Sequence, residues 1–245
     1  MPRLYVPTAL SAGLALSLPT GAARHVQVLR LQPGAPLTLF NDAGGEWAAT
    51  VTRMGRSEVD VLVGAHDATE RELPVRVTLA VGMPANERMD WLVEKATELG
   101  VDAVQPLVCE RSVLRLSGER AEKKRGHWQG VAAAASEQSG RTRVPRIEAV
   151  LSLGEWLRAL PEPAGASPRH VLSLGDGVAL RDALVTVSKG SAAPLFLSGP
   201  EGGLSPAEEA AALARGFRRL SLGARVLRAD TAPLTVMAAV AVAAG

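Results

Sequence analysis

Apolar and polar residues alternate over short runs in the first part of the chain, up to about residue 70. The runs cover residues 37–40, 47–53 and 59–63, and Gly, Asn and Asp stand between them. Alternation with a period of two predicts strands that are buried on one face. Several short strands separated by turn residues predict a small β-barrel. The polar segment 67–74 ends in Pro74 and is expected to be a linker.

From Val75 onward, apolar runs alternate with longer segments of helical pattern. Strands are expected over 75–82, 101–108, 171–174, 194–198 and 219–222. Helices are expected over 87–99, about 119–139, 153–160, 205–215 and 231–244. Alternation of this kind predicts an α/β fold with a mainly parallel sheet and helices on both faces. The sequence therefore predicts two domains, residues 1–70 and 75–245.

Composition narrows the classes of protein to which the chain can belong. Of its 245 residues, 47% are hydrophobic and 21% are charged, which is typical of a globular protein. The single cysteine, Cys109, excludes a disulfide framework and any multi-cysteine metal site. The four histidines are far apart and lack metal-ligand spacing, so no metal is expected.

Two apolar segments could indicate that the protein is secreted or anchored in a membrane. Residues 10–23 loosely resemble a secretory signal, but Pro7 interrupts their start and leucines alternate with small residues, as in a strand. Residues 232–244 are shorter than the ~20 residues that a membrane-spanning helix needs. A cytoplasmic protein without a membrane anchor is expected.

Basic residues are clustered, although the net charge is only +2. Residues 1–41 and 210–229 contain arginines and no acid, and residues 111–146 contain nine basic residues against three glutamates. Clusters of this kind favour a surface that binds a polyanion such as nucleic acid. An ordinary solvated surface is the alternative for any one cluster. The chain has only eight aromatic residues, so base stacking is not expected to dominate.

A glycine-rich loop, residues 199–203, gives the sharpest local signal for a binding site. It joins an apolar strand to a helix whose start is marked by Ser205 as N-cap, Pro206 and Glu208 of a capping box. Glycine lets a ligand approach the main chain closely, and ligands bind at the carboxyl ends of parallel strands. The loop predicts a pocket of backbone groups for a nucleotide-like cofactor. A tight turn that uses glycine for its geometry alone is the alternative.

A second segment, residues 221–235, follows the last predicted strand. Gly223 is followed by Arg225 and Arg228, and the final helix begins at about Thr231. Two arginines beside a glycine loop suit an anionic substrate or a developing negative charge. A pair of surface arginines is the alternative.

Together these segments resemble the bacterial 16S ribosomal RNA uracil-N3 methyltransferases, the RsmE type of the SPOUT superfamily. The resemblance covers the whole chain, and its most specific parts are residues 199–205 and 222–231. It also includes residues 2–5, 28–30, 95–101, 110–112 and 137–141. Asp230 stands where the family usually has Glu, Arg88 replaces a more common Lys, and His25 is displaced by one position.

The resemblance implies a PUA-like N-terminal barrel that helps to hold RNA. It also implies a C-terminal domain with a mainly parallel sheet and a trefoil-knotted chain, an exception to the rule that folds are unknotted. S-adenosylmethionine would bind the loops of the knot, the protein would be a homodimer, and the substrate would be 16S rRNA in the small ribosomal subunit. The implied cofactor-binding residues are Leu174, Leu197, Gly199, Pro200, Gly202, Gly203, Leu222, Gly223, Val226, Leu227 and Thr231.

In the reaction that the resemblance implies, the catalytic residues must activate N3 of uracil. Uracil N3 is a poor nucleophile while it holds its proton, and a guanidinium beside a uracil oxygen would stabilise the anion. We expect Arg228 to take this role. Glu201 is expected either to fix the loop or to contact the substrate, and both alternatives stay open. The expected RNA contacts are Arg3, Arg24, Arg30, Arg111, Arg141 and Arg225.

Two other functions are compatible with these patterns. A SPOUT methyltransferase could act on another RNA site, such as a ribose 2′-hydroxyl or a tRNA base. A non-catalytic RNA-binding assembly factor would account for the basic clusters. It would not account for two glycine loops at strand ends.

Overall fold

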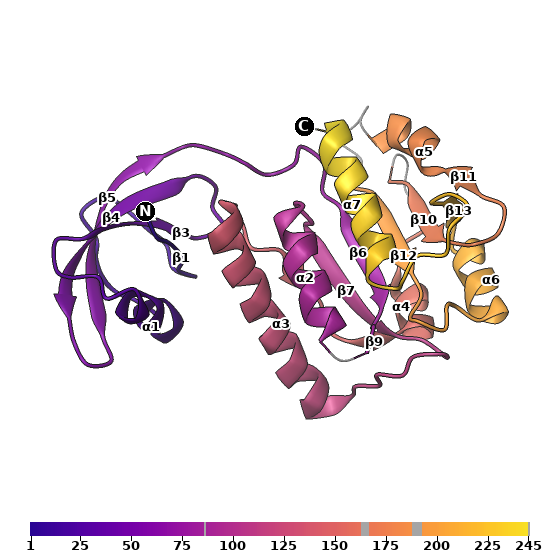
Figure 1. Cartoon of the computed structure of the whole chain (residues 1–245), viewed down its shortest axis with the longest axis horizontal. Helices are drawn as coiled ribbons and strands as arrows, with labels where there is room; N and C mark the ends of the chain where they lie inside the picture. The colour runs from indigo at the N-terminus through magenta and orange to yellow at the C-terminus, as the bar shows by residue number, and fades with distance from the viewer. Residues whose placement is uncertain (86, 163–166, 188–192, 245) are drawn as a thin grey trace. The chain divides into compact units, whose positions relative to one another are not determined.

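The computed structural model of the protein describes all residues except 86, 163–166, 188–192 and 245 (Figure 1). The chain forms two compact units. The first consists of Met1–Glu72 with Ala133–Val144, and the second of Leu73–Ala132 with Pro145–Gly245. The sequence pattern separated residues 1–70 from 75–245 and did not indicate that Ala133–Val144 packs with the first unit. This segment includes the end of one continuous helix, α3 (Gly118–Ser139), whose residue pattern contains no break there.

A five-stranded sheet forms the first unit, in the order β1 (Arg3–Tyr5), β3 (Pro36–Phe40), β4 (Glu46–Met54), β5 (Val59–Asp67) and β2 (Ala15–Ser17). β1 pairs with β3 in parallel, and the other pairs are antiparallel. The three strands expected from alternation are present as β3, β4 and β5. Their inward-facing residues, among them Leu37, Leu39, Val51 and Val61, form a fully buried core.

The expectation that residues 1–70 contain only strands is wrong at one place. Helix α1 covers Thr20–Val28 and buries Ala22, Ala23 and Val26 against the sheet. These three positions lie on one face of a helix, and alanine has the highest helix propensity of any residue. The stripe was missed because it is short and follows a segment that alternates as a strand does.

Acidic residues of the first unit hold the Ala133–Val144 segment. Glu72 is paired with Arg141, and its Oε1 also accepts hydrogen bonds from the N–H groups of Thr142 at 3.1 Å and Arg143 at 3.2 Å. Glu137 accepts a hydrogen bond from the N–H of Tyr5 at 2.9 Å. The segment is therefore attached to the rest of the first unit by contacts between residues that are distant in sequence.

Glu46 of β4 is expected to make the stability of this unit dependent on pH. It is bonded to Arg71 at 2.9 Å and paired with Arg3. The hydrogen bond from Arg71 holds the pKa of the Glu46 carboxyl below its ordinary value of 4.5. A lowered pKa in the folded state adds stability above the unfolded pKa, and that stability is lost as pH falls through the folded value. We expect Glu46→Gln to lower the free energy of unfolding by about 1.5–3 kcal/mol at pH 7, and less at pH 4.

Urea unfolding at both pH values, followed by hydrogen exchange in residues 1–72, measures this effect. The matched control is Glu58→Gln, because the side chains of Glu58 and its partner Arg53 are 66% and 59% exposed. Exposed pairs contribute about 0–1 kcal/mol, so this variant should change little. An equal loss in both variants would contradict the assignment.

The second unit is built on a parallel sheet in the order β11 (Val178–Ala179), β13 (Arg218–Ser221), β10 (Arg169–Leu172), β12 (Leu195–Ser198), β6 (Thr78–Gly82), β7 (Ala103–Val108) and β8 (Arg146–Ile147). β9 (Leu151–Ser152) also pairs with β7, and every pair recorded in this sheet is parallel. The parallel α/β sheet expected from strand–helix alternation is confirmed.

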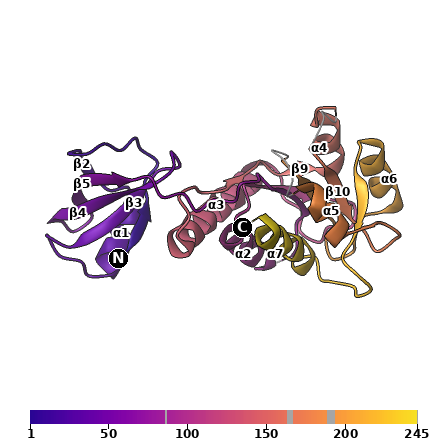
Figure 2. The same cartoon turned by 90° about the horizontal axis from the view of Figure 1, so that it is seen from above.

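Helices cover both faces of this sheet. α2 (Arg88–Glu98) and α7 (Thr231–Ala244) pack together on one side, and α4 (Leu153–Ala159) packs with α6 (Pro206–Ala214) on the other (Figure 2). Successive strand residues face opposite sides, so Leu197 packs against α4 and α6 while its neighbour Phe196 stacks on His170. Burial on both faces explains why these strands appear in the sequence as continuous apolar runs.

Several details of this unit differ from the sequence prediction, which did not include the short strands β8, β9 and β11. β10 ends at Leu172, so Leu174, expected at the end of a strand, lies in a loop and is 79% exposed. Helix α5 (Leu180–Val187) was not predicted. The knotted path of the chain stays a prediction. Within the described part of the chain, no helix has the length and apolar character needed to cross a membrane.

Candidate functional site

A cavity of about 770 Å³ lies at the carboxyl ends of three neighbouring strands of the second unit. The strands are β10, β12 and β13, and the loops that follow them form most of the cavity wall. Parallel sheets bind ligands at this edge because the loops leaving the strands meet there. In Figure 1 the loops lie near the labels β10, β12 and β13.

The loop after β12 is the glycine-rich segment that the sequence singled out. Its turn is closed by a hydrogen bond from the N–H of Gly203 to the carbonyl of Pro200, at 2.8 Å, and Gly203 has a positive φ of 69°. A Cβ on Gly199 would lie 2.7 Å from the backbone nitrogen of Leu204. Glycine is therefore required at both ends of the turn, for conformation at Gly203 and for space at Gly199.

Arg111 contacts two carbonyl groups of this segment. The carbonyl of Gly202 accepts from Arg111 Nη1 at 3.1 Å, and the carbonyl of Leu204 lies 3.5 Å from the same atom. The N–H groups of Glu201, Gly202 and Leu204 donate to no group within the described residues. The loop therefore has main-chain donors available for the acceptor atoms of a ligand.

A Cβ on Gly202 would meet Arg111 Cβ at 2.9 Å. A side chain at this position would therefore displace Arg111.

The helix after the glycine loop begins as its sequence predicted. Ser205 is the N-cap of α6, its hydroxyl accepts from the N–H of Glu208, and the Glu208 carboxylate accepts from the N–H of Ser205 at 2.9 Å. The capping box is confirmed. Glu208 also accepts from the N–H of Glu110 at 2.8 Å, which ties the helix start to the turn after β7.

The loop after β13 forms another part of the cavity wall. Gly223 has a φ of 102°, and Val226 is 77% exposed. The N–H groups of Val226 and Leu227 donate to no group in the described part of the chain. The carbonyl of Arg228 accepts from two N–H groups at the start of α7, at 3.0 Å each, which fixes the backbone of this arginine.

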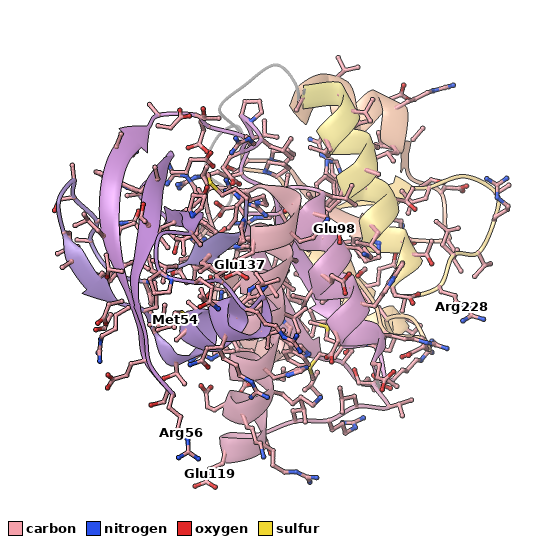
Figure 3. The ribbon with its side chains drawn as sticks, turned by 60° about the vertical axis from the view of Figure 1, so that its left-hand side comes forward. Met54, Arg56, Glu98, Glu119, Glu137 and Arg228 are labelled. Carbon is pink, nitrogen blue, oxygen red and sulfur yellow. The ribbon has the colours of Figure 1, made fainter. Side chains whose placement is uncertain are left out.

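Arg228 and Arg225 both line the cavity, and neither side chain has an ion pair or hydrogen bond among the described residues. Figure 3 shows the labelled Arg228 extending from its loop, clear of the sheet. Two unpaired guanidiniums beside a cavity give it a positive potential. The arrangement suits an anionic substrate or one on which negative charge develops.

Glu201 does not face the cavity as a free carboxylate. Its Oε1 accepts a hydrogen bond from the N–H of Ala85 at 2.8 Å and lies 3.5 Å from Arg88 Nη1. These partners belong to the loop after β6 and the start of α2. Of the two roles that the sequence left open for Glu201, the contacts favour loop fixing.

Glu209 and Ser173 line the cavity and were not identified from the sequence. Glu209 Oε1 accepts from Arg219 Nε and from Ser173 Oγ, both at 2.8 Å. The hydrogen bond from Arg219 holds the pKa of Glu209 below its ordinary range, so the carboxylate is ionised at neutral pH. Both residues adjoin segments that the sequence did identify, Glu209 beside the capping box and Ser173 beside Leu174. The rule that ligands bind at strand ends could have identified Ser173.

The structure brings most of the expected site residues into this cavity. Leu197 and Thr231 are the exceptions: Leu197 is fully buried in the core, and Thr231 begins α7 and is not part of the wall. The residues present in the wall are Glu201 and Arg228, Arg111 and Arg225, and Leu174, Gly199, Pro200, Gly202, Gly203, Leu222, Gly223, Val226 and Leu227.

The other expected RNA contacts lie in the first unit. Arg24 and Arg30 are exposed. In contrast, the side chain of Arg3 is 15% exposed and paired with Glu46, and that of Arg141 is 7% exposed and paired with Glu72. Arg3 and Arg141 are therefore held in ion pairs, whereas Arg24 and Arg30 are accessible to a polyanion.

Cys109 is 1% exposed, and burial raises the pKa of its thiol to about 12. It is a packed side chain and not a nucleophile at neutral pH. No cluster of His, Cys, Asp or Glu that could hold a metal ion occurs among the residues that the structure describes.

Comparisons with known proteins agree with this geometry. An RNA methyltransferase domain matches residues 71–241, and an RNA methyltransferase PUA domain matches residues 18–64. Ribosomal RNA small subunit methyltransferase E of Bacillus subtilis is 32% identical over 224 residues, which covers 90% of this chain and 88% of that protein. The protein of the same name from Mycobacterium tuberculosis is 33% identical over 218 residues, 88% of this chain and 81% of that one.

Two solved structures are similar along nearly the whole chain. Ribosomal RNA small subunit methyltransferase E from Neisseria gonorrhoeae, bound to S-adenosylmethionine, is 35% identical with a TM-score of 0.88, over 98% of this chain and 96% of that one. A putative methyltransferase from Legionella pneumophila, also in complex with S-adenosylmethionine, is 32% identical with a TM-score of 0.90, over 98% and 97%.

Proposed function

Because this chain belongs to the RNA methyltransferase family of the ribosomal RNA small subunit methyltransferase E proteins, we propose that it methylates N3 of one uridine in 16S rRNA. S-adenosylmethionine is the proposed methyl donor. The single observation that carries the proposal is the cavity at the ends of β10, β12 and β13, whose walls offer main-chain donors and unpaired arginines together.

The cavity fits S-adenosylmethionine by the chemistry of its walls. The cofactor has ring nitrogens and a carboxylate that accept hydrogen bonds, and the free N–H groups of Gly202, Leu204 and Leu227 can supply them. Exposed Leu174 and Val226 offer apolar surface to a flat base. When bound, the cofactor supplies an electrophilic methyl group on a sulfonium.

The chain's own residues would then align the uridine and favour ionisation of its N3, with the proton passing to solvent water. The Arg228 guanidinium stays charged at any working pH and would stabilise negative charge on a uracil oxygen. Glu201 would act indirectly, by holding the glycine loop against the loop after β6. Arg225 would contact RNA phosphate or shape the loop. Alignment and charge stabilisation together account for this type of catalysis.

Mass spectrometry of nucleosides from small-subunit RNA of a deletion strain tests the proposed function. We expect one N3-methyluridine to disappear and to return when the wild-type gene is restored. Loss of a ribose methyl or of a tRNA base methyl would identify a related enzyme with another target. Absence of S-adenosylmethionine binding by calorimetry would instead favour a non-catalytic RNA-binding factor.

The first unit is proposed to hold RNA through its exposed arginines. We expect the double variant Arg24→Ala/Arg30→Ala to weaken binding of a 16S rRNA transcript and to reduce the slope of log affinity against log salt by about two, because each phosphate contact releases counterions. Arg53→Ala is a matched control, since Arg53 is paired with Asp60 at 2.6 Å. An unchanged salt slope in the double variant would count against this role.

We further propose that the protein acts in the cytoplasm as a homodimer, as the family that its sequence resembles implies. Sedimentation equilibrium gives the oligomeric state directly, and a monomer at micromolar concentration would refute the proposal.

A further inference from the structure

The turn after β7 reaches the glycine loop through one side chain. Residues 109–112 form a tight turn, in which Ser112 Oγ accepts from the N–H of Cys109 at 2.9 Å and the N–H of Ser112 donates to the carbonyl of Cys109 at 3.1 Å. The turn is tied to α6 by the bond between Glu110 and Glu208. These hydrogen bonds therefore hold the backbone on either side of Arg111 in place.

The Arg111 guanidinium lies on the carbonyl side of the loop. Its Nη1 donates to the carbonyl of Gly202 at 3.1 Å and lies 3.5 Å from that of Leu204. The carbonyl of Pro200 accepts from the N–H of Gly203. Three carbonyls of this segment are thus contacted from within the protein, whereas the N–H groups of Glu201, Gly202 and Leu204 donate to no group among the described residues.

We propose that Arg111 is a positioning residue for the cofactor loop and not primarily an RNA contact. By binding the carbonyls, it holds the peptide groups of the loop so that the available donors of Glu201, Gly202 and Leu204 have a fixed arrangement. Hydrogen bonds from a charged donor are about twice as strong as neutral ones, so one guanidinium can order this short segment. This inference rests on the proposed function, because it assigns the loop to S-adenosylmethionine.

Substitution by lysine separates the two roles. Lysine keeps the positive charge, which is what a phosphate contact needs, but it lacks the planar fork of arginine. We expect Arg111→Ala to weaken S-adenosylmethionine binding about tenfold, and Arg111→Lys about threefold or more. Affinity for a 16S rRNA transcript, and its salt slope, should change little in Arg111→Lys.

Calorimetry with S-adenosylmethionine and salt titration with the transcript measure both quantities on the full-length protein. Arg120→Ala and Arg120→Lys are matched controls, because Arg120 is an exposed arginine on α3 outside the cavity wall. Thermal unfolding of each variant shows whether the fold is retained. Partial recovery of cofactor binding by Arg111→Ala in millimolar guanidinium would further support a role of the side chain itself.

The results distinguish failure of this inference from failure of the proposed function. Wild-type protein that does not bind S-adenosylmethionine would refute the proposed function. Wild-type binding with unchanged cofactor affinity in Arg111→Ala would refute the inference alone. Loss of RNA affinity and salt slope in Arg111→Ala, restored in Arg111→Lys, would show that Arg111 is a phosphate contact instead.

Discussion

Replacement of Arg228 by alanine is expected to slow methyl transfer about 10²–10³-fold and to leave the affinity for S-adenosylmethionine nearly unchanged. The side chain lines the cavity without a partner among the described residues, so its removal breaks no structural contact. What is lost is a permanent positive charge beside the place where uracil becomes anionic. The rate should recover partly as pH rises, because uridine then ionises without help.

Single-turnover methylation of 16S rRNA transcript, measured over a range of pH with labelled cofactor, tests this expectation. Arg225→Ala is the matched control, since Arg225 lines the same cavity and is also unpaired. It should weaken RNA binding and keep an ordinary rate at saturating RNA. If Arg228→Ala retains near-normal rates, or gains no additional pH dependence, the electrostatic role belongs elsewhere, with Asp230 and Glu201 the first residues to examine.

Gly199→Ala is expected to weaken cofactor binding about tenfold to a hundredfold. The added Cβ would lie 2.7 Å from the backbone nitrogen of Leu204 and 2.9 Å from the carbonyl carbon of Gly203. Backbone atoms cannot rotate away as a side chain can, so the loop itself must open. The N–H groups that the loop offers to a ligand would then lose their arrangement.

Calorimetry with S-adenosylmethionine measures this loss, and circular dichroism establishes that the variant is folded. Gly130→Ala serves as the control, because Gly130 lies within α3 and a Cβ there meets nothing within 4 Å. That substitution should stabilise the protein by about 0.5–1 kcal/mol and leave cofactor affinity unchanged. Wild-type affinity in Gly199→Ala would show that the cofactor does not depend on this turn.

Local sequence determined the central strands of the second unit and the helix that follows the glycine loop. The apolar runs that become β6, β7 and β12 are buried on both faces, and the capping box of Ser205 and Glu208 sets the first turn of α6. Both signals act between residues that are close in sequence. For this reason the glycine loop and its place at the end of a strand could be predicted.

Only the tertiary structure shows which distant residues form ion pairs and hydrogen bonds with one another. Arg141 belongs to a basic cluster in the sequence, but it is buried against Glu72, which lies 69 residues away. Arg111 is expected from the sequence to contact RNA, and in the folded chain its guanidinium donates to the carbonyl of Gly202, 91 residues away. Glu201 meets the N–H of Ala85 across 116 residues. The pattern of charges along the sequence predicts that such residues are exposed to solvent, because it does not show which distant residues they contact.

The sequence by itself therefore determined the strand–helix order of the second unit and the glycine turn with its helix cap. The tertiary structure decided which strand ends meet around one cavity, which arginines remain unpaired beside it and which acids hold the loops. The reason is physical: propensity, alternation and capping are interactions over a few residues. Strand order and ion-pair partners depend on contacts between distant segments, which form only when the chain is folded.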